Sequence, residues 1–219
     1  MSAVEREQPR LTWRDRLTVD LPDSELDGVR IDHFTIKPGN VHNFRLRAEG
    51  RGTRPGTYTR LLADGQLWMS DTDAEKMDHL PAVKFMEATK AERVLIHGLG
   101  IGMVLAAALS FEHVKHVDVV ELDERIIKLV GPHYTADSRV HIHHGDAYTY
   151  RFPVGSYWQV AWHDIWGDGI SSDDLPQMAT MMRRYGRRTD WQGCWGQDIA
   201  RRQQRRQRAE SRREREFFG

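Results

Sequence analysis

A glycine-rich run restricts the fold of this 219-residue chain more than any other feature. The run covers residues 94–102 and reads VLIHGLGIG, so an apolar segment leads directly into three spaced glycines. A buried strand that enters a glycine turn before a helix lets the backbone approach a ligand, because no Cβ stands in the way. We therefore expect Gly98, Gly100 and Gly102 to form a ligand-binding loop in an α/β fold.

Apolar segments of strand length alternate with helical segments from this run onward. Strands spaced by helices of this length predict βαβ units and a mainly parallel sheet of the Rossmann-like type. The predicted strands are 93–97, 117–122, 140–144 and 158–165, and the predicted helices are 103–109, 123–130 and 175–185.

Acidic residues follow two of these strands. Glu121 comes 23 residues after Gly98, close to the roughly 20 residues at which an acid reaches a nucleotide ribose. Asp146, followed by Ala147, stands where it can accept a hydrogen bond from an adenine amino group. Singly, these residues also fit a strand end and a helix cap, and the glycines fit a tight turn. Together, at successive strand ends, they favour a nucleoside cofactor. NAD fits less well, because its fingerprint places a glycine at position 103, which is Met103 here.

The chain before the glycine run has a different pattern of apolar and polar residues. Residues 1–28 predict a mostly irregular arm, and 29–90 predict a β region followed by a lead-in helix. Alternation predicts strand segments at 29–31, 34–36, 44–47, 57–62 and 66–70, and Asp64-Gly65 between the last two indicates a hairpin. Asp71 or Asp73 is expected to cap this helix, which runs to about Ala88 and is expected to break or kink at Pro81.

The combination of hairpin, glycine loop, Glu121 and the Gly145-Asp146-Ala147 run resembles class I S-adenosylmethionine-dependent methyltransferases, in particular their spermidine-synthase-like branch. The resemblance covers roughly residues 57–168. It implies that S-adenosylmethionine is the cofactor of a domain over residues 91–186. Its methionine part would lie over the glycines, its ribose at Glu121 and its adenine at Asp146 and Ala147.

Departures from that branch bear on the reaction. Spermidine synthases have an aspartate in the glycine loop that grips the amine of decarboxylated S-adenosylmethionine, and this chain has Ile101 there. The branch's glutamine after the hairpin is replaced by Trp68, and its Tyr-x-Glu contacts become Met77 and His79. These changes favour methyl transfer to an unidentified acceptor over aminopropyl transfer.

Asp164 is the candidate catalytic residue, because it keeps the first aspartate of the branch's Asp-Ser-Ser-Asp motif after the fourth strand. It could take a proton from the acceptor or bind a donor group of it. The alternative is that it caps the following turn.

The charge is divided unevenly along the chain. Residues 183–219 contain twelve Arg against five acids, a balance of +7, and residues 1–182 carry −7. We expect an Arg-rich C-terminal helix over 187–219, which could contact nucleic acid, the acidic body or a partner subunit, including another copy of the chain. Two strands of the full methyltransferase fold have no counterpart in this segment. Two alternatives therefore remain. The sheet is completed by the N-terminal β region or by another subunit, or the fold is abridged and the protein binds the cofactor without catalysis.

Several other classes are disfavoured. A single cysteine, Cys194, fits a reducing compartment, and no apolar run has the length of a signal peptide core or membrane span, so we expect a cytoplasmic protein. His141 and His143 share a strand face while His144 points away, so no metal site is expected. His97, His163 and Trp162 are expected in the core or at its rim.

Overall fold

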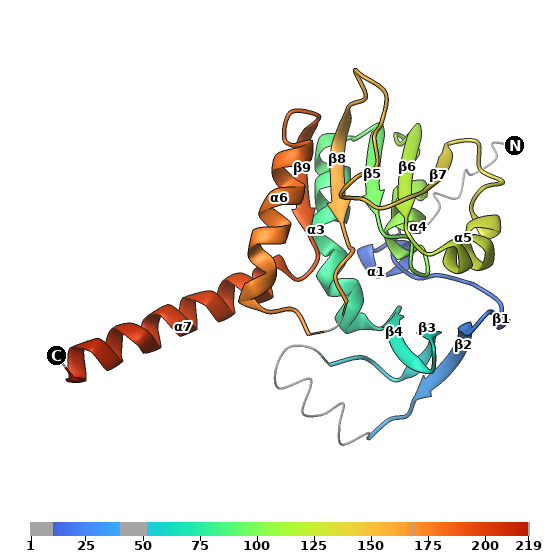
Figure 1. Ribbon diagram of the computed structural model, residues 1–219. Helices are drawn as coiled ribbons and strands as arrows, with labels where there is room; N and C mark the ends of the chain where they lie inside the picture. Colours follow the sequence, from blue (N-terminus) through green and yellow to red (C-terminus); the bar gives the residue numbers. More distant parts are fainter. Residues whose placement is uncertain (1–10, 40–51, 168, 219) are drawn as a thin grey trace, which may run out of the picture.

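Five parallel strands form the larger sheet of the computed structural model, which describes residues 11–39, 52–167 and 169–218 (Figure 1). Its strand order is β7-β6-β5-β8-β9. The chain passes from β5 outward through β6 to β7 and then crosses to β8, so the order reverses between β5 and β8. Open α/β sheets bind ligands at the carboxyl ends of strands beside such a reversal. The predicted Rossmann-like α/β class is confirmed. The strands are β5 (Arg93–His97), β6 (His116–Glu121), β7 (Val140–His144), β8 (Trp158–His163) and β9 (Thr189–Cys194).

Helices cover both faces of this sheet. Val94 and Ile96 of β5 belong to the apolar cluster that includes α3, α4 and α5, whereas Leu95 belongs to the cluster that includes α6. This alternation is what a strand buried on both faces requires. The helices are α3 (Asp73–Thr89), α4 (Met103–Leu109), α5 (Glu124–Val130) and α6 (Leu175–Tyr185), with short 3₁₀ turns at η1 (Gly131–His133) and η2 (Ser172–Asp174).

A smaller antiparallel sheet precedes α3. It has the order β1-β2-β3-β4, from β1 (Ser24–Leu26), β2 (Val29–Ile36), β3 (Gly56–Ala63) and β4 (Gln66–Ser70). Asp64 and Gly65, both with positive φ, turn β3 into β4. This sheet is separate from the parallel one, so the N-terminal β region does not complete the larger sheet. The strand predicted at 44–47 lies outside the described residues.

The described section of the arm predicted over 1–28 contains two short regular elements. Residues 11–28 contain helix α1 (Trp13–Arg16) and strand β1, and Leu17 and Leu21 are fully buried. Thr12 and Asp15 form a capping box that starts α1. The segment thus contributes apolar side chains to the main core.

A break or kink was predicted at Pro81, and the break is wrong, because α3 continues through that residue to Thr89. The kink stays a prediction. The carbonyl that loses a helical partner at Pro81 belongs to Met77, whose side chain is exposed, so this turn lies near solvent. The helix is preceded by Thr72, while Asp71 accepts the N–H of Thr59 and Asp73 pairs with Arg54. Neither aspartate is therefore the N-cap residue.

The segment after α6 departs from the prediction of helix over 187–219. Residues 189–194 form β9, which pairs in parallel with β8, and helix α7 (Gln197–Phe218) begins only after Gly196. Trp191 of β9 stacks on Phe85 of α3, with ring centroids 4.7 Å apart, so β9 is held by the core. Helix α7 then projects away from the body (Figure 1).

Across the described parts of the chain, every helix is too short or too polar to cross a bilayer.

Candidate cofactor and active site

The glycine loop lies between β5 and α4 and is tightly enclosed. Gly98, Gly100 and Gly102 have φ of +90°, +50° and +81°, conformations that favour glycine. A Cβ on Gly98 would lie 2.0 Å from the carbonyl oxygen of Asp164. The loop thus lies close to the end of β8, on the opposite side of the strand-order reversal.

Glu121 lies at the end of β6 and holds the loop directly. Its Oε2 accepts the N–H of Leu99 at 2.6 Å, and its Oε1 accepts the N–H of Asp123 at 2.8 Å. The residue is buried. Each carboxylate oxygen has two lone pairs, so Glu121 keeps acceptor capacity for a ribose hydroxyl. The contact with Leu99 is a structural role that the sequence did not indicate.

Asp146 and Ala147 follow β7 at the same edge of the sheet. Oδ1 of Asp146 accepts the N–H of Tyr148 at 2.8 Å, which organises the turn after the strand. Ala147 is buried and belongs to the apolar cluster with Val120. Asp146 thus caps a turn and not the helix of the alternative interpretation, and its contact with adenine stays a prediction.

Asp164 follows β8 and shares a small cavity, of about 10 Å³, with Gly98, Leu99, Met69 and His79. Burial, with added repulsion from Glu75, Asp78 and Glu121, raises the pKa of Asp164 to about 8. The contact that the described residues give its carboxylate is Nε2 of His79 at 3.8 Å, longer than a hydrogen bond. A carboxyl group with such a pKa, beside a loop of this kind, is a functional-site candidate.

His79 reaches this cavity from α3. Its ring is buried, and its Nδ1 accepts the indole N–H of Trp162 at 3.2 Å. Burial lowers the pKa of His79 to about 4, so the ring is neutral at pH 7. In the sequence His79 appeared only as a departure from a known motif. The helical spacing from Asp78 gave no sign that the ring turns inward toward Asp164.

Met69 of β4 covers the glycine loop and was likewise missed. Its sulfur lies 3.3 Å from the N–H of Ile101 and would be 2.2 Å from a Cβ on Gly100. A nucleoside cofactor fits the donors and acceptors of the site, but the space over the loop is filled by this side chain. Methionine is unbranched and adaptable, so its movement would open the loop to a ligand.

Two buried histidines, His97 and His163, stand directly before Gly98 and Asp164 at the ends of β5 and β8. His97 Nδ1 and His163 Nδ1 are 2.7 Å apart, and both rings are fully buried. The amide of Gln192 donates to Met182 O, so its oxygen accepts from His163 Nε2 at 3.0 Å. His163 Nδ1 is then the acceptor and His97 Nδ1 the donor, which leaves His97 Nε2 unprotonated and without a partner. Burial lowers the pKa of both, that of His163 to about 4. The prediction of core positions for His97 and His163 is confirmed.

One histidine of β7 and one of β6 contact a buried carboxylate. Asp118 of β6 accepts from His143 and His116, each at 2.7 Å, and from the Trp158 indole at 2.8 Å. Burial alone would raise the pKa of Asp118, but these hydrogen bonds outweigh it and hold the pKa at about 2. His144 contacts Leu122 O, and no group of metal-ligating side chains was found among the residues that the structure describes.

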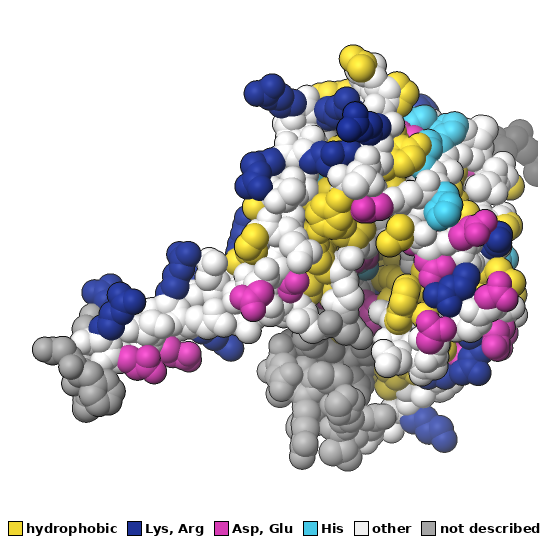
Figure 2. All heavy atoms as spheres, viewed as in Figure 1, with side chains coloured by type: hydrophobic (Ala, Val, Ile, Leu, Met, Phe, Trp, Pro, Cys, Tyr) yellow, Lys and Arg dark blue, Asp and Glu magenta, His cyan; other side chains and the backbone are white. Residues whose placement is uncertain are grey.

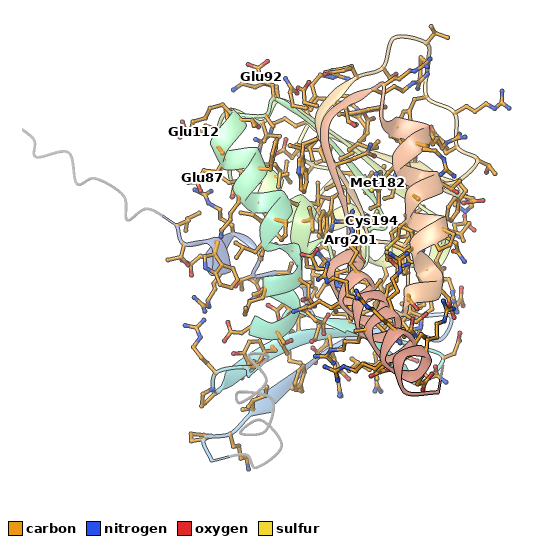
Figure 3. All side chains as sticks on the ribbon, turned by 90° about the vertical axis from the view of Figure 1, so that its left-hand side faces the viewer. Glu87, Glu92, Glu112, Met182, Cys194 and Arg201 are labelled. Atoms are coloured by element: carbon orange, nitrogen blue, oxygen red, sulfur yellow. The ribbon has the colours of Figure 1, made fainter. Side chains whose placement is uncertain are left out.

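Helix α7 and Cys194 adjoin a larger groove, of about 550 Å³, along β9. Figure 3 shows Met182, Cys194 and Arg201 where α6, β9 and α7 meet. Burial raises the pKa of Cys194 to about 12, so its thiol is unreactive at neutral pH. Figure 2 shows Arg side chains along α7 with acidic side chains among them. The mixture is typical of a solvated helix and leaves the nucleic-acid partner a prediction.

Two curated proteins are similar to part of this chain. A polyamine aminopropyltransferase of Prochlorococcus marinus is 34% identical over 91 residues, which are 37% of this chain and 32% of that protein. Polyamine aminopropyltransferase 2 of Bacillus cereus is 35% identical over 99 residues, 40% of this chain and 27% of that protein. The chain resembles the spermidine-synthase-like branch. The matches span about a third of the length of these relatives or less, and no protein-family model matches the chain.

Solved structures with a similar arrangement include enzymes of two kinds. Spermidine synthase from Thermotoga maritima matches 64% of this chain and 46% of its own, with 20% identity and a TM-score of 0.42. A putative caffeoyl-CoA O-methyltransferase from Staphylococcus aureus matches 52% of each chain, with 17% identity and a TM-score of 0.41.

Proposed function

We propose that this chain is an S-adenosylmethionine-dependent methyltransferase with an acceptor that remains to be identified. The observation that carries the proposal is Asp164, a carboxyl group with raised pKa at the end of β8. It lies in one cavity with Gly98 of the glycine loop. A candidate proton acceptor and a candidate cofactor loop thus adjoin at the strand-order reversal, where open α/β sheets bind ligands.

The residues of the loop support methyl transfer over aminopropyl transfer. Ile101 is fully buried, so the position that holds an aspartate in spermidine synthases offers no carboxylate to an amine here. Glu121 offers acceptor capacity for the ribose, and the glycines allow close approach of the methionine part. S-adenosylmethionine, when bound, supplies an activated methyl group, so the protein's main task is to align the acceptor with it.

Asp164 would act on the acceptor rather than on the cofactor. Its ionised form can take a proton from an acceptor hydroxyl or amine, or accept a hydrogen bond that orients it. Because its pKa is raised to about 8, the ionised fraction grows as the pH increases through neutrality. We expect the rate of methyl transfer to increase over the same range and to level off above pH 8.

Aminopropyl transfer is the second candidate, and two observations favour it. The curated relatives are named polyamine aminopropyltransferases. In addition, Glu75 and Asp78 lie close enough to Asp164 to raise its pKa, and a cluster of carboxyl groups suits a cationic amine.

Calorimetric titration of the full chain with S-adenosylmethionine and with its decarboxylated form separates these functions. Tighter binding of the intact cofactor supports methyl transfer and justifies a screen of acceptors. Tighter binding of the decarboxylated form would move the assignment to aminopropyl transfer. Binding of neither would overturn both and favour an inert member of the fold.

The same titration tests Glu121. Glu121→Ala is expected to weaken cofactor binding by about 1–3 kcal/mol, the size of a hydrogen bond to a charged group. Glu121→Gln is the matched variant, because its amide oxygen can still accept the N–H of Leu99. Unchanged affinity in a folded Glu121→Ala protein would contradict the ribose assignment.

A further inference from the structure

The side chain that approaches the Asp164 carboxylate comes from a different element, helix α3. Nε2 of His79 lies 3.8 Å from Oδ2 of Asp164, and both residues line the cavity beside Gly98. The His79 side chain is 2% exposed, so it cannot turn to bulk water for a partner.

Trp162 decides which nitrogen of this ring carries the proton. An indole N–H only donates, so the bond of 3.2 Å from Trp162 Nε1 requires a lone pair on His79 Nδ1. The ring is neutral, with its one proton then on Nε2, the nitrogen that faces Asp164. The rings of His79 and Trp162 meet edge to face, with centroids 6.0 Å apart, which restricts rotation of the imidazole.

The charges around Asp164 make this N–H important. Glu75 and Asp78 of α3 and Glu121 of β6 all oppose ionisation of Asp164, as does burial. The other side chains that line the cavity, among them Met69, Leu99 and Met103, are apolar and offer no strong donor. A donor from His79 favours the ionised carboxylate, and it binds one oxygen while leaving the other for a substrate.

We propose that His79 is a positioning residue, which offers its Nε2 proton to Oδ2 of Asp164 and so orients and stabilises the carboxylate beside the glycine loop. The proposal rests on the proposed role of Asp164 in group transfer. The distance of 3.8 Å is about 0.6 Å beyond the upper limit of an N–H···O hydrogen bond. Contacts of this kind in ligand-free sites commonly shorten once a substrate is bound. Trp162 acts one step further away, by holding the tautomer.

Nuclear magnetic resonance tests this directly and needs neither cofactor nor acceptor. In the full, isotope-labelled chain, the Asp164 carboxyl signal is assigned by its loss in Asp164→Asn and then titrated in three proteins. His79→Phe removes the donor and is expected to raise the pKa of Asp164 by about one unit. His79→Gln keeps a donor for Asp164 and an acceptor for Trp162, and is expected to restore the wild-type titration to within about 0.3 units.

Further variants keep the test decisive. If His79→Phe fails to fold, Trp162→Phe leaves the ring in place and frees its tautomer. Ring nitrogen spectra should then show the proton shared between Nδ1 and Nε2 in place of Nε2 alone, and the pKa of Asp164 should increase. His113→Gln is the control. His113 also contacts α3, through a hydrogen bond with Met86 O, and its replacement should leave the titration of Asp164 unchanged.

The outcomes separate this proposal from the proposed function. An Asp164 titration that is the same in wild type and His79→Phe would overturn the positioning role, as would an equal shift in the Phe and Gln variants. The expected shifts, together with failure to bind either cofactor in the calorimetric titration, would leave His79 as a positioning residue and reject the proposed transferase. Where transfer activity is found, the pH profile of kcat/KM should shift with the titration.

Discussion

Two aspartates of the parallel-sheet region, the buried Asp118 and the partly buried Asp164, have opposite ionisation behaviour. Asp118, in the middle of β6, accepts hydrogen bonds from His116, His143 and Trp158, and its pKa falls to about 2. Asp164, at the end of β8, has His79 at 3.8 Å and three acids nearby, and its pKa rises to about 8.

The difference shows that burial alone does not decide the state of a carboxyl group. Burial raises the pKa of both residues, and the donors aimed at the ionised form decide the result. Asp118 has a complete set of donors and is a structural residue. Asp164 lacks such a set of donors, so its carboxyl group holds a proton that it can exchange near neutral pH, as a group in acid–base catalysis requires.

The largest effect is expected from removing the satisfied carboxylate. Asp118→Ala leaves two histidines and a tryptophan N–H without their acceptor, so the free energy of unfolding should fall by about 3–5 kcal/mol. Urea unfolding at pH 7 measures it. Asp118→Asn keeps one acceptor oxygen and should cost less. A loss below about 1 kcal/mol in the alanine variant would show that the network adds little to stability.

Replacement of Asp164 is expected to change the free energy of unfolding in the opposite direction. The raised pKa of Asp164 means that the folded state keeps a proton that the unfolded chain releases above about pH 4, so the folded state becomes less favoured as the pH increases toward 8. Asp164→Asn removes this cost and should increase the free energy of unfolding at pH 8 by roughly 2–4 kcal/mol. The gain should vanish near pH 4. A variant less stable than wild type at pH 8 would contradict the raised pKa.

The buried histidines should act at acidic pH. Folded-state pKa values of about 4 for His79 and His163 lie below the ordinary value of 6.5, so their contribution is present above pH 6.5 and is lost as the pH falls toward 4. Asp164 makes the folded state more stable as the pH falls, which opposes the effect of the histidines. Unfolding free energies are therefore best compared in proteins that carry Asp164→Asn. There, adding His79→Gln should reduce the loss of unfolding free energy between pH 7 and pH 5 by about 1–2 kcal/mol. Equal losses with and without His79 would argue against a neutral buried ring.

The smallest effect is expected from the exposed charges of α7. Its contacts with η2 include Gln203 and Gln207, which accept hydrogen bonds from Ser172. A chain that ends at Gln207 should therefore unfold within about 0.5 kcal/mol of the full chain, because solvated charges contribute little. Retention of RNA and DNA by the two chains across a salt series shows whether the removed arginines bind phosphates. A large loss of stability would mean that the end of α7 packs on a surface.

The local residue pattern was sufficient to predict most strands of the parallel sheet and the position of the glycine loop. The apolar run from Val94 ends in glycines whose positive φ needs no tertiary partner to be anticipated, and alternation of strand and helix implies the crossovers. It failed at Thr189–Cys194, because an edge strand that mixes polar, glycine and aromatic residues has no clear periodicity. It also did not predict that α3 continues through Pro81 or that Leu17 and Leu21 are fully buried, because packing against the core overrides weak local preferences.

The sequence by itself determined the class of fold and the strand ends at which Gly98, Glu121, Asp146 and Asp164 stand, because backbone geometry and hydrophobic periodicity are local properties. Only the tertiary structure decided the ionisation state and the hydrogen-bond partners of the side chains at this site. The pKa of Asp164 depends on burial and on Glu75, Asp78 and Glu121, and the tautomer of His79 depends on Trp162. These groups are distant in the sequence and come together only when α3 packs on the sheet, and electrostatic interactions depend on distance in space.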